Sequence, residues 1–513
     1  RADPAADVFD NPGISVKLSA LHPRYESVQA ERLMLELVPR VTELARMAAK
    51  ANIGFNIDAE EANRLDISLD VIEAVFRDEE LRGWDGFGIV VQAYAKSCLP
   101  VLNWFHALAA SLQSRVAVRL VKGAYWDMEI KQAQTLGLQT FPVFTRKSST
   151  DVSYLAGARF LLDHADWIYP QFASHNAHTI AAVVVMAEQQ ATQMARFEFQ
   201  RLHGMGESLH AQVLERTGRI CRIYAPVGEH EDLLAYLVRR MLENGANSSF
   251  VNQLMDERIA PARLVADPID VAVSVPGIVN PKIPLPIDLY QPARLNSRGW
   301  DVNDAADQRM LAAAIEPFVQ TRWQAAPAIG SIDLSAWLET PQAVCNPANP
   351  ADTVGTVVAL TADGAAVMLA CAQAAQPAWA AVTFAQRAAV LEQIADGYEQ
   401  HAGELVALLI REAGKNRVDA IAEVREAVDF CRYYAQQARD GLDDSAAVAT
   451  GVQVCISPWN FPLAILTGQI VAALVAGNAV IAKPADQTPL IAARAVALMH
   501  EAGVPADVLG LAP

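Results

Sequence analysis

Short apolar runs alternate with longer amphipathic stretches through the first half of the sequence. Residues 31–50, for example, carry apolar side chains three and four positions apart, as an amphipathic helix does. Strands that alternate with helices indicate parallel βα units. The candidate strands are residues 13–20, 54–60, 88–94, 116–124, 168–176, 197–204 and 222–228.

This spacing predicts an α/β fold, a (βα)8 TIM-type barrel, whose remaining strand would precede residue 1. The alternative is a doubly wound open sheet, which usually has fewer units and a glycine-rich first turn. The sequence contains no GxGxxG motif. The barrel is therefore the favoured prediction.

The pattern changes after the barrel. Residues 256–300 are rich in proline and poor in periodicity, which is typical of an extended linker. Residues 361–440 are alanine-rich and helical, and a strand, helix, strand and helix follow. We predict a barrel over 1–262, a linker over 263–320 and an α/β domain over 321–513 that is cut off within its sheet.

Residues 452–482 carry no charged side chain and are long enough to span a bilayer. Pro458, Pro462 and Gly477 interrupt this run, so we interpret it as a strand, a helix and a strand buried in a soluble domain. The N-terminus lacks the apolar core of a signal peptide. These features predict a cytoplasmic protein, with peripheral attachment to the inner membrane as an option.

The 513 residues carry a net charge of -17, which argues against binding to duplex nucleic acid but leaves room for a local basic pocket. The six cysteines form no CxxC pair and no zinc spacing, as in cytosolic proteins with free thiols. The histidines also lack metal-ligand spacing, so we predict no metal site.

Polar side chains occur at the end of each of the seven candidate strands. Taken singly, each could be an ordinary surface group, but together they predict a large polar ligand across the barrel mouth. Arg239 and Arg240 lie on a helix after the last strand, and paired guanidinium groups suit a carboxylate. An exposed helix face is the alternative for this pair.

The strings VKLSALHPRYE, FNIDAEEANRLDISLD, RLVKGAYWDMEIKQAQ, YPQFASHNAHT, FEFQRLHGMGE, RIYAPVGEHEDLLAYLVRRMLENGANSSFVN and PKIPLP resemble the proline dehydrogenase domain of the bacterial proline utilization A family. The resemblance covers nearly all of residues 12–290. It implies a barrel that holds FAD, oxidises L-proline to Δ1-pyrroline-5-carboxylate and passes electrons to a membrane quinone.

The same resemblance assigns roles to individual residues. Lys17, Arg239 and Arg240 would clamp the proline carboxylate, and Asp58 would orient that cluster. The pocket for the proline ring would be walled by Tyr125, Leu202 and Tyr224. The residues implied for FAD are Gln92, Arg119, Val121, Lys122, Gly123, Ala124, Tyr125, Trp126, Thr145, Arg146, Lys147, Ser174, His175, Asn176, Gln200, Leu202 and Glu243.

Two departures from the family pattern stand out. Ser174 occupies a position where the family often has threonine, and the hydroxyl is kept. The family's first barrel strand has no counterpart in the sequence, so we expect an open sheet edge.

The strings NPANPADTVGTV, SPWNFPLAI, AGNAVIAKPADQTPL and EAGVPADVL resemble the start of an aldehyde dehydrogenase. The resemblance implies an NAD site lined by Ile456, Pro458 and Trp459, with Lys483 and Asp486 on the adenosine ribose. Asn460 would donate a hydrogen bond to an oxyanion. The family's nucleophilic cysteine and general-base glutamate lie downstream, and Cys455 is interpreted as a core thiol.

The resulting hypothesis is a bifunctional enzyme that is incomplete at both ends. FAD-dependent oxidation of L-proline would be coupled to NAD-dependent oxidation of glutamate semialdehyde to L-glutamate, with channelling of the intermediate. We also expect a homo-oligomer. The rival hypotheses are a metal-dependent aldolase and a proline-responsive regulator that retains the barrel as a sensor.

Overall fold

The computed structural model describes residues 2–189, 196–229, 265–441 and 448–513, together with a few positions between 231 and 241. They form two compact units. The barrel unit comprises residues up to 133 and 141–283, and the second unit comprises residues 134–140 and 284–513. The stretch predicted as a linker, 263–320, is therefore divided between the two units and includes two helices.

The barrel unit contains a seven-stranded sheet in which every neighbouring pair is parallel and the strands follow chain order. This arrangement confirms the predicted barrel and all seven candidate strands. Within the described residues, β1 and β7 each pair with a single strand. The strands are β1 (Gly13–Val16), β2 (Gly54–Ile57), β3 (Phe87–Gln92), β4 (Val116–Val121), β5 (Ile168–Ala173), β6 (Glu198–Leu202) and β7 (Cys221–Tyr224).

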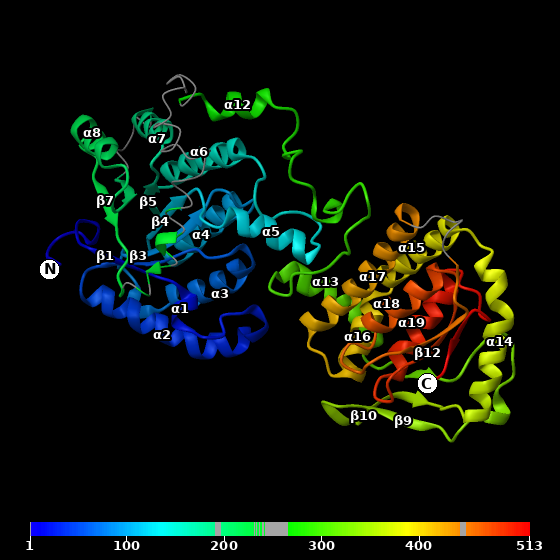
Figure 1. Cartoon of the computed structure of the whole chain (residues 1–513). Helices are drawn as coiled ribbons and strands as arrows, with labels where there is room; N and C mark the ends of the chain where they lie inside the picture. The colour runs from blue at the N-terminus through cyan, green and yellow to red at the C-terminus, as the bar shows by residue number, and fades with distance from the viewer. Residues whose placement is uncertain are drawn as a thin grey trace. The chain divides into compact units, whose positions relative to one another are not determined.

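Helices connect the strands and lie along the outside of the sheet (Figure 1). This alternation is what makes the strands parallel, because each helix returns the chain to the starting edge. The helices are α1 (Leu18–Leu21), α2 (Ala30–Lys50), α3 (Leu65–Phe76), α4 (Cys98–Leu112), α5 (Trp126–Leu136), α6 (Lys147–Asp163), α7 (Ala177–Gln189), α8 (Glu207–Thr217) and α12 (Pro268–Ser274).

The two faces of the barrel sheet differ in polarity. Residues at alternate strand positions, such as Phe55, Ile89 and Leu120, are buried in the apolar cluster shared with the helices. The positions between them carry polar side chains, among them Asn56 and Arg119. Because successive side chains of a strand point to opposite faces, the interior of this barrel is polar.

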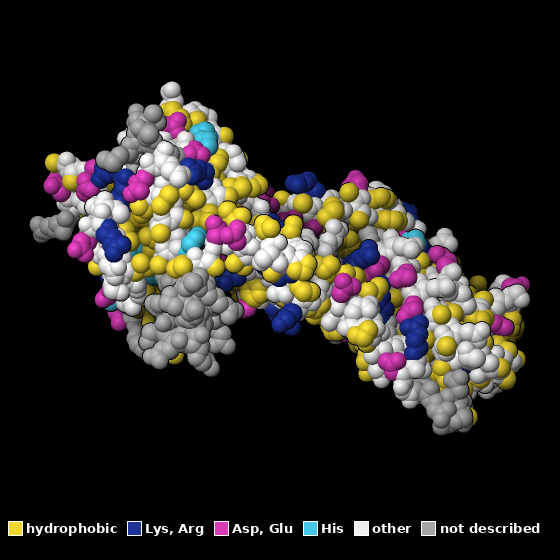
Figure 2. Space-filling model, turned by 90° about the horizontal axis from the view of Figure 1, so that it is seen from above, with side chains coloured by type: hydrophobic (Ala, Val, Ile, Leu, Met, Phe, Trp, Pro, Cys, Tyr) yellow, Lys and Arg dark blue, Asp and Glu magenta, His cyan; other side chains and the backbone are white. Residues whose placement is uncertain are grey.

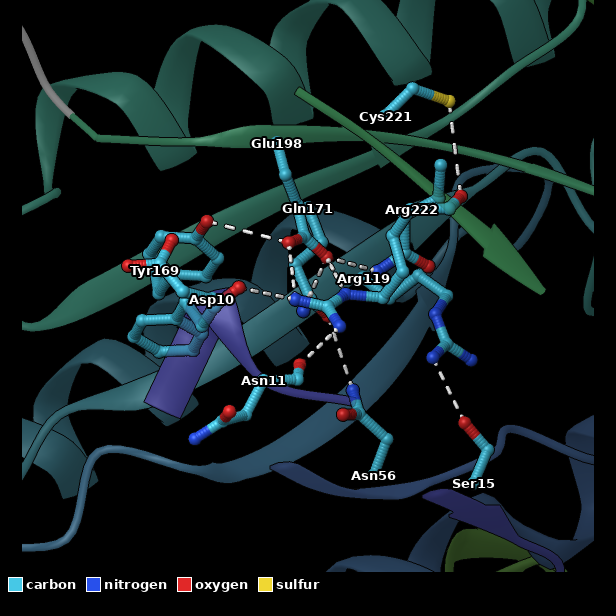
Figure 3. A network of polar contacts seen from close by, with 12 residues as sticks. Asp10, Asn11, Ser15, Asn56, Arg119, Tyr169, Gln171, Glu198, Cys221 and Arg222 are labelled. Carbon is cyan, nitrogen blue, oxygen red and sulfur yellow. Dashed lines mark hydrogen bonds and ion pairs between the residues drawn. The ribbon is translucent and has the colours of Figure 1, made fainter. Parts of the chain in front are cut away.

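The segment before β1 covers part of the polar interior. The ring of Phe9 stacks on Tyr169 with a centroid distance of 3.5 Å. Arg222 on β7 donates hydrogen bonds to the carbonyl oxygens of Phe9 and Asn11, at 2.6 and 2.8 Å. Arg222 also pairs with the fully buried Glu198 of β6 (Figure 3). These contacts tie β7 to the chain that leads into β1.

The second unit contains two three-stranded sheets with helices around them. One has the order β8-β10-β9, with a parallel and an antiparallel pair, and the other is the parallel sheet β11-β12-β13. The elements are α13 (Ala305–Ile315), β8 (Trp323–Ala325), β9 (Gln342–Asn346), β10 (Asn349–Val357), α14 (Ala362–Ala380), α15 (Phe384–Gln400), α16 (Ala402–Ala413), α17 (Arg417–Asp440), β11 (Val452–Ile456), α18 (Ala464–Val475), β12 (Ala479–Lys483), α19 (Pro489–Glu501) and β13 (Leu509–Leu511).

The uncharged run 452–482 forms β11, α18 and β12, as its interruption by Pro458, Pro462 and Gly477 predicts. In the described part of the chain, no helix alone is long and apolar enough to cross a membrane. Helices α14 and α15 meet that criterion only as a pair, across a bend of 116°. On the face shown in Figure 2, acidic and basic side chains are interspersed.

Two buried glutamates cap helices of the second unit. Glu412 accepts hydrogen bonds from the backbone N–H groups of Leu490 and Ile491, at 2.7 and 2.8 Å, where α19 begins. Glu423 accepts from the N–H groups of Leu463 and Ala464, where α18 begins. The first N–H groups of a helix have no partner within the helix, so these carboxyl groups fix the starts of α18 and α19.

We expect replacement of Arg222 by methionine to lower the free energy of unfolding of the barrel unit by about 3–5 kcal/mol. The substitution leaves the Glu198 carboxylate buried without its cation. Denaturant unfolding monitored by circular dichroism measures the change. Arg82→Met is the control, because Arg82 forms an exposed pair with Glu79 and its loss should cost less than about 1 kcal/mol. Equal effects of the two substitutions would contradict a stabilising role for the buried ion pair between Arg222 and Glu198.

Glu412 should make the stability of the second unit depend on pH. Burial raises its pKa to about 8, against about 4.3 in an unfolded chain. Between these values the folded state holds the extra proton, so the free energy of unfolding falls as pH rises, by up to about 1.4 kcal/mol per pH unit. The free energy of unfolding, measured with urea between pH 5 and 8, should depend less steeply on pH in Glu412→Gln than in the wild type. An identical dependence in the two proteins would refute the role of Glu412.

Candidate functional site

Several predicted site residues of the barrel lie together at the carboxyl ends of its strands. Lys17 directly follows β1, Asp58 directly follows β2 and Tyr224 ends β7. Arg119 lies within β4 and also points into the barrel, where it contacts Asp58. Parallel strands bring these ends to one rim, which is where barrel enzymes build their sites.

Arg119 is the centre of this cluster. One of its amino groups donates to Oδ1 of Asp58 and the other to the hydroxyl of Ser15, each at 2.9 Å. Its guanidinium carbon lies 5.3 Å from the centroid of the Tyr224 ring. Asp58 in turn accepts a hydrogen bond from the Tyr224 hydroxyl, at 3.2 Å. Arg119 is 7% exposed, so this charge is held in one position by three strands.

Lys17 approaches the same carboxylate from the other side. Its Nζ lies 3.9 Å from Oδ2 of Asp58 and donates to the hydroxyl of Tyr125, at 3.3 Å. The side chain of Lys17 is 34% exposed, so its ammonium group can also reach a bound molecule. Two cations face one carboxylate, and the excess positive charge suits a small anion.

The Tyr224 phenol keeps its proton in this environment. Burial raises its pKa well above the ordinary value, and the neighbouring charge of Asp58 acts in the same direction. Tyr224 therefore donates a hydrogen bond at neutral pH, which holds Asp58 in place.

Most residues predicted to contact FAD lie at the same rim. Gln92 donates to the carbonyl of Glu60 at 2.9 Å, and His175 accepts from the N–H of Leu202 at 3.0 Å. Ser174 and Asn176 shape the turn before α7: the Ser174 hydroxyl accepts from the N–H of Asn176. Val121 ends β4, and Ala124 follows it in the loop that leads to α5.

The loop after β4 has a geometry that requires glycine. Gly123 adopts a φ of +134°, which side chains rarely tolerate. A Cβ atom on residue 123 would also lie 2.5 Å from Cγ of Tyr94. The glycine lets the loop backbone pack directly on this ring. Beside it, Lys122 pairs with Asp151, and the Trp126 indole donates to the carbonyl of Phe144 at 2.8 Å.

Thr145 and Arg146 have partners that the sequence did not indicate. The Thr145 hydroxyl accepts from the N–H of Asn280, at 3.0 Å. Arg146 donates to the carbonyl oxygens of Pro276 and Val279, at 3.1 and 3.2 Å. Both residues thus hold the segment after α12, whereas the resemblance implies contacts with FAD. Burial lowers the pKa of the neighbouring Lys147.

Three predicted site residues, Arg239, Arg240 and Glu243, lie outside the described residues. The carboxylate clamp is therefore described only through Lys17 and its neighbours.

In the second unit, the loop after β11 carries the predicted NAD and oxyanion residues. Trp459 and Ile456 are largely exposed, and Pro458 and Asn460 lie beside them in the sequence. The loop ends where Glu423 caps α18. Lys415 forms an ion pair of 2.7 Å with Glu423, and its Nζ lies 4.4 Å from the centroid of the Phe461 ring.

The remaining predicted residues of this unit form a local pair. Nζ of Lys483, at the end of β12, donates to Oδ1 of Asp486 at 2.9 Å. Cys455 is buried, and burial raises its pKa to about 11, so it is a protonated thiol at neutral pH. This agrees with its interpretation as a core residue.

Five residues of the barrel interior were missed at the sequence level although they support the site. The signal that could have found them is the two-residue period of a strand: each lies on the inward face, two or four positions from a predicted residue. They are Ser15, Asn56, Gln171, Glu198 and Arg222.

Comparison with known families agrees with this architecture. Residues 1–253 match the proline dehydrogenase family, and residues 335–513 match the aldehyde dehydrogenase family. The two matches fall on the barrel unit and the second unit, respectively.

Individual proteins match along the whole chain. The bifunctional protein PutA of Salmonella typhimurium is 50% identical over 100% of this chain and 39% of its own length, and that of Rhizobium meliloti is 49% identical over 99% and 41%. A solved structure of a Bradyrhizobium japonicum PutA mutant is 46% identical, with a TM-score of 0.86, and covers 100% of this chain and 49% of that one. The chain thus spans about two fifths of the length of the curated relatives. It belongs to the PutA family, with a proline dehydrogenase domain in the barrel unit and an aldehyde dehydrogenase domain in the second unit.

Proposed function

We propose that the barrel unit binds L-proline and FAD and catalyses the oxidation of proline to Δ1-pyrroline-5-carboxylate. The observation that carries this proposal is the cluster of Lys17, Arg119, Asp58 and Tyr224 at the barrel rim. It combines fixed positive charge with hydrogen-bonding groups inside the family's barrel. The match of residues 1–253 to the proline dehydrogenase family supports the choice of substrate.

The substrate carboxylate would lie against Lys17. The Lys17 side chain retains exposed surface, whereas both amino groups of Arg119 already donate hydrogen bonds, to Asp58 and to Ser15. Asp58 keeps Lys17 and Arg119 close to each other without full neutralisation. Tyr125 and Tyr224 contact the cluster through their hydroxyl groups, and their rings would meet the apolar part of proline. Fixing the substrate by its carboxylate aligns the carbon that is oxidised.

The residues present fit FAD. Nε of Arg119 is buried and has no hydrogen-bond partner within the described residues, so it can serve a bound acceptor. Gln92, Lys122, His175 and Gln200 add the mixed donors and acceptors that a flavin dinucleotide needs. When bound, FAD supplies the two-electron chemistry, and the protein supplies position and field. The Arg119 charge would favour the reduced, anionic flavin.

For the second unit we infer a part in the NAD-dependent oxidation of glutamate semialdehyde to L-glutamate. Asn460, in the loop fixed by Glu423, would donate to the oxyanion. Ile456, Pro458 and Trp459 present an exposed apolar surface for NAD, and the pair of Lys483 and Asp486 would meet its ribose.

The remaining features of the proposal come from the sequence resemblance. They are a membrane quinone as electron acceptor, a homo-oligomer and channelling of the intermediate; the cytoplasmic location, with peripheral attachment to the inner membrane as an option, comes from the sequence features described above. The alternative of a proline-responsive regulator gains no specific support from the described residues.

The proposed activity predicts a change in the absorption spectrum. The intact purified protein should show flavin bands, and L-proline added without oxygen should bleach them because the flavin is reduced. D-Proline is the matched control and should bleach them far more slowly, since its carboxylate cannot reach Lys17 in the same ring orientation. Flavin bands that persist with L-proline would refute the substrate, and a protein that takes up no flavin would refute the cofactor.

Asp58→Asn should lower kcat/KM for proline by roughly 10- to 150-fold while FAD stays bound, because hydrogen bonds between charged groups are each worth about 1.5–3 kcal/mol. The amide removes the charge that orders Lys17 and Arg119. Steady-state kinetics with the bound flavin content measured in parallel provide the test. Asp78→Asn is the control, since Asp78 pairs with Arg46 away from the rim. An unchanged kcat/KM would exclude Asp58 from the site.

A further inference from the structure

A buried carboxylate beneath the site has no part in the proposed chemistry so far. Glu198, on β6, is 0% exposed. Arg222 binds both of its oxygens, Nε to Oε1 at 2.8 Å and a terminal nitrogen to Oε2 at 2.9 Å. As the carboxylate partner in this two-pronged ion pair, Glu198 accepts hydrogen bonds and donates none.

The carboxylate fixes the direction of two glutamine amides, Gln171 and Gln200, of which Gln171 is labelled in Figure 3. Nε2 of Gln200 donates to Oε1 of Glu198 at 2.6 Å, and Nε2 of Gln171 donates to the same oxygen at 3.0 Å. Oε1 of Gln171 then accepts from Nδ2 of Asn56, at 3.2 Å. Since an acceptor-only group must face each NH2, the reversed orientation of either amide would set oxygen against oxygen.

Gln200 lies between Glu198 and the rim. It follows Glu198 by two residues on the same strand face, and Leu202, a predicted wall of the substrate pocket, follows by two more. The nitrogen and oxygen of an amide diverge from one carbon atom. With its NH2 group directed at Glu198, Gln200 therefore directs its oxygen away from the buried carboxylate.

We propose that Glu198 is a positioning residue for the cofactor: it fixes Gln200 as a hydrogen-bond acceptor for an N–H or O–H group of FAD. This inference rests on the proposed function. Arg222 pairs with Glu198 and also binds the segment before β1, so the contacts that tie β7 to that segment and the contacts that orient Gln200 share one carboxylate.

The test is a double-substitution cycle read out by FAD affinity, measured from the quenching of flavin fluorescence by the intact apoprotein. Gln200→Met keeps the side-chain length and removes the acceptor, and it should weaken FAD binding by about 2- to 12-fold, the value of one hydrogen bond. Glu198→Gln should also weaken binding, and the double variant should bind no more weakly than Gln200→Met alone. Tyr169→Phe, which removes a 3.4 Å contact with Glu198, is the control and should leave affinity unchanged.

Two results would overturn the inference: full affinity in Gln200→Met, or multiplied losses in the double variant, which would indicate a general structural role. A wild-type protein without affinity for FAD would instead overturn the proposed function together with this inference.

A second variant decides the matter if Glu198→Gln does not fold. Gln200→Glu places a second carboxyl group beside Glu198. Its protonated form can donate to Glu198 as the amide does, whereas its ionised form is repelled. FAD affinity of Gln200→Glu should therefore fall as pH rises, relative to the wild type over the same range. A pH-independent ratio of the two affinities would refute the orienting role of Glu198.

Discussion

The ion pair between Glu198 and Arg222 is the interaction on which the barrel unit most depends. A carboxylate that is fully buried requires a cation and further donors, and Arg222, Gln171, Gln200 and Tyr169 provide them. The same guanidinium reaches the carbonyl oxygens of Phe9 and Asn11. One buried charge thus links β5, β6 and β7 to the segment that precedes β1.

This polar interior explains how the barrel can hold a charged site at its rim. The outward faces of the strands pack on the helices and supply the apolar core. The inward faces are then free to carry Ser15, Asn56 and Glu198 in place of the branched apolar residues that usually fill a barrel. Each of these inner groups is hydrogen-bonded: Asn56 and Glu198 are joined through Gln171, and Ser15 accepts from Arg119, which also pairs with Asp58.

In the second unit, a buried glutamate holds the site loop in place by capping a helix. Glu423 satisfies the first N–H groups of α18 and so fixes the end of the loop that carries Asn460. Lys415 balances the charge of Glu423 and packs on Phe461 in that loop. In both units, therefore, a buried glutamate sets the position of a residue that we propose contacts a ligand: Gln200 for FAD in the barrel and Asn460 for the oxyanion in the second unit.

The sequence by itself determined the seven strands, the helices between them and the strand–helix–strand reading of 452–482, because hydrophobic periodicity is a local property. It also determined which residues stand at the strand ends, since the carboxyl end of a parallel strand follows from the chain direction. Only the tertiary structure decided that Glu198, Gln171 and Arg222 meet, because they come from three different strands. Glu198 must also be buried away from water before Arg222 and Gln171 can bind it in this way. The tertiary structure alone also directed Arg146 to the carbonyl oxygens of Pro276 and Val279, a contact between residues about 130 positions apart that no local pattern encodes.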